Sequence, residues 1–170
     1  EVGCHGVAEG AALAAAGPDS SLAVAKRKSP RATCAVAIAP APIDIAAIAR
    51  PQGRLLIVGT GPGSAAWMTA ECEAAVAAAS DLVGYSLYLD ILGSRAAGRT
   101  RHDFPLGEET GRVRAALDLA AGGRTVALVS SGDPGIYAMA TLAFELIDSG
   151  GRADWGRVAV EVCPGISALQ

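Results

Sequence analysis

Short continuous apolar runs recur through the chain after residue 50, and segments with the period of a helix separate them. The continuous runs predict strands over residues 54–58, 82–85, 125–130 and 158–163. The periodic segments predict helices over residues 69–80, 87–92, 108–121 and 136–148. Because apolar strands alternate with helices, the pattern predicts an α/β fold with a mostly parallel sheet and helices on both of its faces.

Two of these helices have recognisable end signals. Thr69 is a suitable N-cap, and Glu71 and Glu73 would place negative charge in the first turn that follows it. Gly122 and Gly123 come directly after the apolar pattern of the third helix and predict its end.

The beginning of the chain has a sparser pattern. It predicts a helix over residues 7–16 and strands over residues 22–25 and 34–39, with a basic loop over residues 26–31. These elements are too few to build a core of their own. We therefore expect them to be the end of a domain whose body lies before residue 1.

Two proline clusters follow and indicate a partly ordered linker. The predicted organisation is a domain tail over residues 1–39, a linker over residues 40–53 and an α/β domain over residues 54–170.

Charge and composition narrow the classes of function. A net charge of −3 at pH 7 argues against a nucleic-acid-binding protein. No apolar stretch approaches the roughly 18 to 20 residues that span a bilayer, so the sequence excludes a membrane span. The four cysteines show neither metal-ligand nor disulfide spacing. We therefore expect no metal, reduced thiols and a cytoplasmic location.

Three of the predicted strands run into loops rich in glycine and proline, over residues 59–64, 130–137 and 163–168. Ligands of open α/β sheets bind beyond the carboxyl ends of the strands, where these loops would lie. The first loop is not a phosphate-binding P-loop, since no lysine follows Lys28. It lacks a Rossmann pattern as well, because Asp81 precedes its strand rather than following it.

The second loop is the most informative of the three. Its glycines allow a ligand to approach the backbone, and Pro134 is expected to fix the start of the following helix. Asp133 has two interpretations: it caps that helix, or it binds an amine or hydroxyl of a ligand. Together the loops predict a ligand held mainly by backbone groups.

In this order and spacing, the three loops resemble the tetrapyrrole methylase family, whose members transfer a methyl group from S-adenosylmethionine. The resemblance rests on Ile57–Gly63, Ser131–Tyr137 and Val162–Ser167, and it covers residues 54–170, the first of the two domains of that family. The segment Asp81–Asp90 is most similar to the precorrin-3B C-17-methyltransferase branch (CobJ/CbiH type).

A second resemblance covers residues 2–39. The segments Gly6–Leu13, Lys26–Ser29 and Ala32–Ala35 are similar to the end of the C-terminal, CobE-like domain of CbiG, another cobalamin-biosynthesis protein. Both resemblances point to one pathway, and the chain looks like part of a fusion of neighbouring pathway proteins.

The family resemblance implies a set of site residues. The residues that would contact S-adenosylmethionine are Gly132, Asp133, Ile136, Tyr137, Pro164, Gly165 and Ser167. The residues that would contact a tetrapyrrole are Gly61, Pro62, Gly63, Ser64 and Arg101. Many relatives have Asp where this chain has Ser64, so an acid role for that loop is not expected. His102 is the candidate catalytic acid or base, with an ordinary loop histidine as the alternative.

The implied activity is methylation of precorrin-3B, or of its cobalt analogue, at C-17 with contraction of the ring. That interpretation also implies a homodimer and contacts with other cobalamin-pathway enzymes. Two alternatives stay open: a family member acting on another precorrin, on rRNA or on a protein, and a non-catalytic binding or scaffold module. Because the cofactor of the family lies between two domains, we expect these 170 residues alone to bind it weakly and to be inactive.

Overall fold

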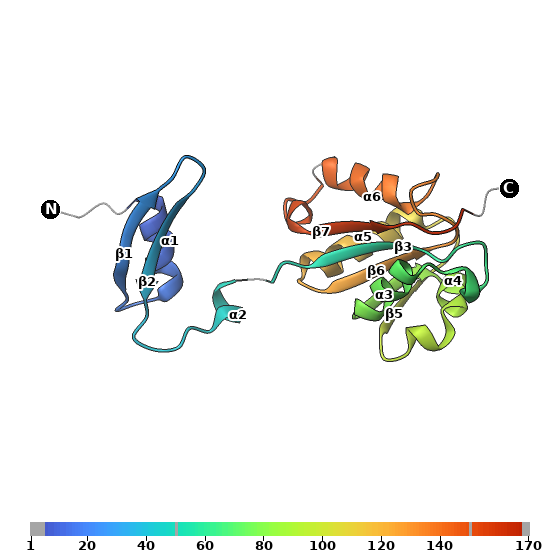
Figure 1. The fold of residues 1–170 in the computed structure, drawn as a ribbon, viewed down its shortest axis with the longest axis horizontal. Coiled ribbons are helices and arrows are strands. Elements are labelled where there is room, and N and C mark those ends of the chain that lie inside the picture. Colours follow the sequence, from blue (N-terminus) through green and yellow to red (C-terminus); the bar gives the residue numbers. More distant parts are fainter. Residues whose placement is uncertain (1–5, 50, 150, 168–170) are drawn as a thin grey trace. The chain divides into compact units, whose positions relative to one another are not determined.

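A computed structural model describes residues 6–49, 51–149 and 151–167 of the chain. The chain divides into two compact units, residues 1–50 and residues 51–170 (Figure 1). This division falls within the predicted linker, and each unit is described by itself.

The first unit consists of one helix and one hairpin. Its elements are α1 (Val7–Ala16), the antiparallel strands β1 (Ser21–Lys28) and β2 (Thr33–Ile38), and the short helix α2 (Ile45–Ile48). None of its described side chains is buried, as expected from its few apolar runs. The predicted basic loop is wrong in part, because Lys26, Arg27 and Lys28 belong to β1. Pairing of Arg27 with Cys34 and of Lys28 with Thr33 extends the hairpin ladder through them.

The second unit contains a five-stranded sheet with the strand order β5-β4-β6-β3-β7. Its strands are β3 (Arg54–Gly59), β4 (Asp81–Tyr85), β5 (Thr100–Phe104), β6 (Thr125–Ser130) and β7 (Ala159–Cys163). Every neighbouring pair is parallel, which confirms the predicted α/β fold with a parallel sheet. The register pairs Gly59 with Ser130 and Val58 with Cys163, so three strands finish side by side.

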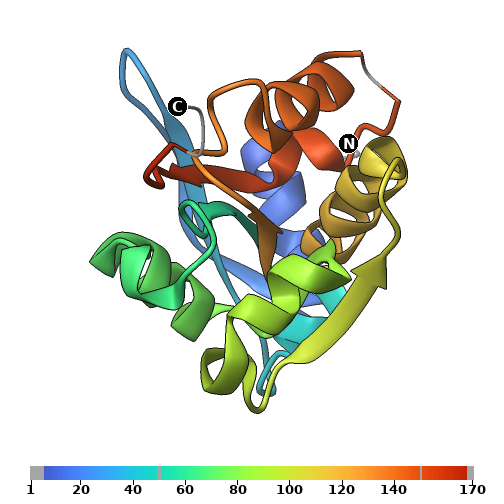
Figure 2. The same ribbon diagram turned by 90° about the vertical axis from the view of Figure 1, so that its right-hand side faces the viewer.

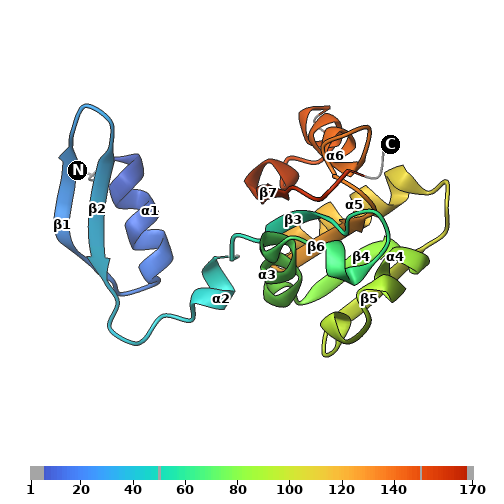
Figure 3. The ribbon, with the colours of Figure 1, turned by 45° about the vertical axis from the view of Figure 1, so that its right-hand side comes forward.

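Helices cover both faces of this sheet (Figure 3). They are α3 (Ala70–Ala78), α4 (Ser86–Ile91), α5 (Glu109–Ala121) and α6 (Met139–Asp148), with short 3₁₀ helices at Ala65–Trp67, Gly93–Ala96 and Trp155–Arg157. Helices α5 and α6 pack on one face through residues such as Val113 and Ala143. Helices α3 and α4 pack on the other through Val76 and Leu89, giving one apolar cluster on each side.

Two expectations for this unit are wrong. No strand was predicted over residues 100–104, yet β5 lies at the edge of the sheet and pairs with β4. The predicted helix over residues 136–148 begins only at Met139, because Tyr137 has a φ of +50° and interrupts the helical backbone.

The predicted N-cap of α3 is confirmed, since the Thr69 hydroxyl accepts a hydrogen bond from the Cys72 N–H at 3.2 Å.

Within the described ranges, none of the helices is both long and apolar enough to cross a lipid bilayer.

Candidate functional site

The three glycine-rich loops meet at the end of the sheet where β3, β6 and β7 finish (Figure 2). Gly61 and Gly132 exchange two backbone hydrogen bonds, of 3.3 and 2.9 Å, which join the first loop to the second. The buried Thr60 adds a bond from its hydroxyl to the carbonyl of Ser130 at 3.1 Å. The predicted meeting of these loops at one sheet edge is therefore present in the structure.

Close backbone approach explains why glycine is needed at two of these positions. A Cβ on Gly59 would lie 2.2 Å from the carbonyl oxygen of Gly132, and a Cβ on Gly165 would lie 2.2 Å from the same oxygen. Any side chain there would force the loops apart, because van der Waals contact between such atoms requires more than 3 Å. Glycine at these two positions therefore allows the three loops to pack against one another without a steric clash.

Asp133 holds the second loop against the third. One carboxylate oxygen accepts a hydrogen bond from the Gly135 N–H at 2.7 Å, and the other accepts from the Gly165 N–H at 3.1 Å. Asp133 does not cap α6, since that helix begins at Met139. A carboxylate accepts about four hydrogen bonds, so capacity for a ligand donor remains.

A cavity of about 190 Å³ opens beside this carboxylate. The residues that line it are Ser131, Gly132, Asp133, Ile136, Tyr137, Ala138 and Ser167. A more open groove of about 630 Å³ adjoins it along the start of α6. Ligand pockets usually enclose roughly 300–1,000 Å³, so a nucleoside-sized ligand anchored at Asp133 would extend beyond the smaller cavity.

The cavity wall includes an unusual backbone conformation at Tyr137. Its φ of +50° is rare for a bulky residue, and its side chain is 98% exposed. Strained residues of this kind concentrate at binding and catalytic sites. The conformation places an aromatic ring in solvent at the mouth of the cavity, where it is available to a ligand.

Residues of the third loop also make hydrogen bonds that stabilise the fold. The carbonyl of Pro164 accepts hydrogen bonds from the Thr69 hydroxyl at 3.2 Å and from the Cys72 thiol at 3.4 Å. Of the two other predicted cofactor contacts in this loop, Ser167 lines the cavity, and Gly165 donates to Asp133.

Three of the predicted tetrapyrrole-binding residues of the first loop, Pro62, Gly63 and Ser64, are exposed, whereas Gly61 is buried. Gly61 and Gly63 have positive φ values of 75° and 124°, and they bracket the exposed Pro62. Ser64 is exposed and receives a hydrogen bond from the Ala66 N–H at 3.3 Å. Trp67, which closes the following 3₁₀ turn, keeps 55% of its surface exposed and was not predicted as a site residue.

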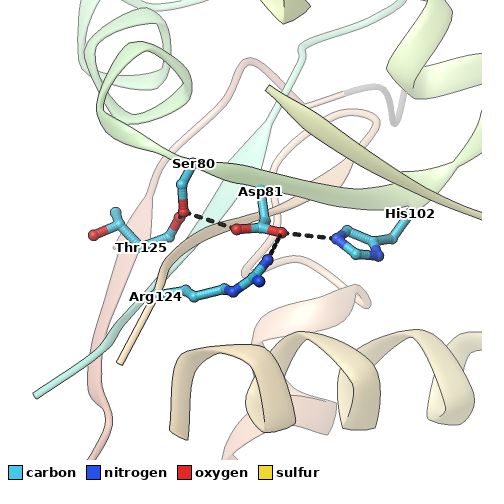
Figure 4. Close-up of polar contacts among 5 residues, drawn as sticks. All are labelled: Ser80, Asp81, His102, Arg124 and Thr125. Atoms are coloured by element: carbon cyan, nitrogen blue, oxygen red, sulfur yellow. Dashed lines mark hydrogen bonds and ion pairs between the residues drawn. The ribbon is translucent and has the colours of Figure 1, made fainter. Parts of the chain in front are cut away.

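Arg101 and His102 lie apart from these loops, on β5. Arg101 is already paired with Asp90 at 2.9 Å and Asp103 at 2.7 Å. The ring of His102 lies 2.8 Å from the carboxylate of Asp81, the first residue of β4. Arg124, which directly precedes β6, lies 2.7 Å from the same oxygen (Figure 4). This network occupies the amino end of the strands, so the structure does not bring His102 together with the loops.

One further group of possible ligand residues has no signal in the sequence. Side-chain donor atoms of Glu71, Glu161 and Cys163 lie within 4.8 Å of one another. Burial, followed by the nearby Cys72 and carboxylate charges, raises the pKa of Cys163 to about 11, so its thiol is protonated at neutral pH, whereas metals bind thiolates. Glu161 is also paired with Arg54 at 2.9 Å. The three residues are distant in sequence, which is why spacing could not reveal them.

Comparison with known proteins identifies this arrangement. The sequence model of the tetrapyrrole (corrin/porphyrin) methylases matches residues 54–170. A precorrin-3B C(17)-methyltransferase from Sinorhizobium sp is 46% identical over 117 residues, which cover 69% of this chain and 45% of that protein. The chain thus spans less than half the length of this relative.

Solved structures agree with the match. The methyltransferase CobJ has 38% sequence identity and a TM-score of 0.63, over 69% of this chain and 48% of that one. A uroporphyrin-III C-methyl transferase from Thermus thermophilus, complexed with S-adenyl homocysteine, shares the fold with a TM-score of 0.52 at 23% identity, over 69% of this chain and 50% of that one. The chain belongs to the tetrapyrrole (corrin/porphyrin) methylase family.

Proposed function

We propose that this chain carries the cofactor-binding part of an S-adenosylmethionine-dependent methyltransferase of cobalamin biosynthesis. The proposed reaction is methylation of precorrin-3B, or of its cobalt analogue, at C-17 with ring contraction. The observation that carries the proposal is the junction of three glycine-rich loops around the Asp133 carboxylate and its cavity. The 46% identity to a relative named for this reaction supports the choice of substrate.

The residues of the cavity fit S-adenosylmethionine by their chemistry. They combine the Asp133 carboxylate, hydroxyl groups on Ser131 and Ser167, and the apolar side chain of Ile136. Such a mixture suits a ligand with a charged amino-acid end and an aromatic base. The smaller cavity would hold one end of the cofactor, and the groove along α6 leaves room for the rest.

When bound, the cofactor supplies a methyl group already activated on a sulfonium, so the protein contributes mainly positioning and exclusion of water. Asp133 would fix one end of the cofactor while it holds Gly165 in place. The first loop, whose residues Pro62, Gly63 and Ser64 are exposed, would face the tetrapyrrole. Ring contraction also needs a proton transfer, and the contacts of His102 do not support that role.

The remaining interpretations stay predictions. Formation of a homodimer and binding to other enzymes of the pathway are predictions, because the contacts among the described residues test neither of them. The resemblance of residues 2–39 to the end of a CbiG domain is likewise a prediction.

The test uses the full-length protein. Calorimetry with S-adenosylmethionine is expected to show binding, and mass spectrometry is expected to show one added methyl group and a ring-contracted product from precorrin-3B or its cobalt analogue. Asp133→Asn is expected to weaken cofactor binding about tenfold or more, the size of one lost charged hydrogen bond. Asp148→Asn, at the exposed end of α6, is the matched control. Absence of cofactor binding would favour a scaffold module, and turnover of another substrate would favour a different family member.

A further inference from the structure

A buried arginine lies outside the site described above. Arg112, in the first turns of α5, is only 2% exposed. Most arginine side chains keep the guanidinium group in water, because burying a charge is unfavourable unless it is paired and hydrogen-bonded. A guanidinium buried to this extent therefore requires acceptors close to it.

Its contacts within the described residues are few and long. Nη2 donates to the carbonyl of Pro105 at 3.4 Å and lies 3.7 Å from a carboxylate oxygen of Glu109. Nε is buried and has no hydrogen-bond partner in the described part of the chain. A guanidinium offers five N–H donors, so most of its capacity is unused. A buried polar group in this condition points to an acceptor that the folded chain does not itself provide.

The position of Arg112 indicates what kind of acceptor is missing. Pro105 directly follows β5, so the guanidinium lies at the carboxyl end of that strand, the same end of the parallel sheet as the glycine-rich loops. Side chains of a helix lean toward its N-terminus. The Arg112 side chain therefore lies beside the first turn of α5, whose N-cap, Glu108, provides no side-chain capping bond. Helix N-termini attract anions through their free N–H groups.

We propose that Arg112 and the first turn of α5 form an anion site that binds a carboxylate of the tetrapyrrole substrate. The identity of the ligand rests on the proposed function, since corrin precursors carry several carboxylates. Guanidinium groups bind carboxylates through two parallel hydrogen bonds, and Nε together with Nη2 offers that geometry.

Two acidic residues flank the site. The carboxylate of Glu109 is the one near Nη2, and that of Glu108 lies close to Gly111, where an added Cβ would be 3.2 Å from it. The same Glu109 oxygen accepts a hydrogen bond from the Gly107 N–H at 3.3 Å, and the side chain is 40% exposed. A ligand carboxylate at hydrogen-bond distance would replace the longer contact with Glu109.

The cover over the guanidinium is a small exposed turn. Residues 105–108 are all exposed, and Gly107 has a φ of +88°. The guanidinium bonds to this turn through the carbonyl of Pro105 at 3.4 Å, and the backbone N–H of Arg112 donates to the carbonyl of Glu108 at 2.9 Å. Displacement of the turn would open Nε to a carboxylate without disturbing the apolar face of α5.

Kinetics of the full-length protein test the site by substitution. Arg112→Gln is expected to raise KM for precorrin-3B about tenfold or more, as for a lost charged hydrogen bond, while the Kd for S-adenosylmethionine changes less than about twofold. Arg112→Lys should recover part of the loss, because it keeps the charge but not the paired donors. Arg114→Gln, an exposed neighbour on the same helix, is the control. An unchanged KM in a folded Arg112→Gln variant would overturn the proposal.

A second measurement needs no variant and no turnover. The Arg112 Nε–Hε resonance of the full-length protein is followed by NMR during titration with uroporphyrin, a stable tetrapyrrole with eight carboxylates. A shift with uroporphyrin, absent when its carboxyl groups are converted to amides, supports the anion site even if Arg112→Gln fails to fold. No shift overturns it. Failure of the unsubstituted protein to methylate precorrin-3B would contradict the proposed function and leave this NMR result to judge the site.

Discussion

The buried carboxylate of Asp81 joins three segments at the amino end of the sheet. It accepts hydrogen bonds from Ser80 at 2.7 Å and Arg124 at 2.7 Å, and it pairs with His102 at 2.8 Å. Burial alone raises the pKa of Asp81, but the bonds from His102, Ser80 and Arg124 outweigh it and lower that pKa below its usual value. His102 therefore links β5 to β4 through its contact with Asp81.

A lowered pKa in the folded state has a defined effect on stability. The ionised Asp81 contributes stability above the pKa of an unfolded Asp, about 3.9, and this contribution is lost as pH falls through the lower, folded value. We predict that Asp81→Asn lowers the free energy of unfolding by about 2 kcal/mol at pH 7, the size of a broken charged hydrogen bond. Urea unfolding of the 170-residue chain at pH 7 and at pH 3 measures it. The difference from the unsubstituted chain should shrink at pH 3.

The exposed pair of Asp90 with Arg101 supplies the control for this experiment. The Asp90 side chain is 62% exposed, so Asp90→Asn should change stability by less than about 1 kcal/mol, as for surface ion pairs. An Asp81→Asn effect that stays the same at both pH values would show that packing, rather than charge, is responsible.

At the scale of elements, burial decided what the sequence could predict. The strand over residues 125–130 was predicted with its observed bounds, because a strand buried on both faces has a continuous apolar pattern. Strand β5 was not predicted. It is an edge strand with alternating partial exposure, and it contains Arg101, His102 and Asp103 in place of a continuous apolar run. The start of α6 was misplaced for another reason: the positive φ of Tyr137 has no signature in the order of residues.

The same reasoning applies to the site. Glycine spacing located all three loops, because close approach of backbones leaves glycine as the residue that fits. Three features arise from tertiary packing: the bond from the Gly165 N–H to Asp133, the cluster around Cys163, and the Nε of Arg112, which has no partner among the described residues. A single sequence carries no direct record of such contacts.

Thr69 links an element to the site. Its hydroxyl caps α3 by accepting from the Cys72 N–H, and it donates to the carbonyl of Pro164 in the third loop. We predict that Thr69→Ala destabilises the chain by about 1 kcal/mol through loss of the cap. It should also weaken cofactor binding by the full-length protein, because the third loop loses an anchor. Thermal unfolding and calorimetry measure the two effects.

The control for Thr69 is Thr110→Ala, an exposed threonine in the first turn of α5. It should change neither quantity by more than a small amount. Loss of stability without any change in cofactor affinity would mean that the Pro164 contact does not position the loop.

At the scale of the whole molecule, the described buried side chains all belong to one unit. Both apolar clusters lie in residues 51–170, whereas the described residues of the first unit are half-buried or exposed. Burial of apolar surface is the main source of folding free energy. The second unit should therefore hold nearly all of the cooperative stability of the chain.

Deleting residues 1–50 tests this distribution. Residues 51–170 are expected to unfold in one calorimetric transition, with a Tm within about 2 °C of the main transition of the complete 170-residue chain. For a domain of this size 1 kcal/mol shifts Tm by roughly 4 °C, so such agreement bounds the contribution of the first unit to about 0.5 kcal/mol. The Asp81→Asn variant of the shortened chain should lose as much stability as it does in the longer one, since all its partners are retained. A fall in Tm of several degrees on deletion would show instead that the first unit packs on the second and completes its core.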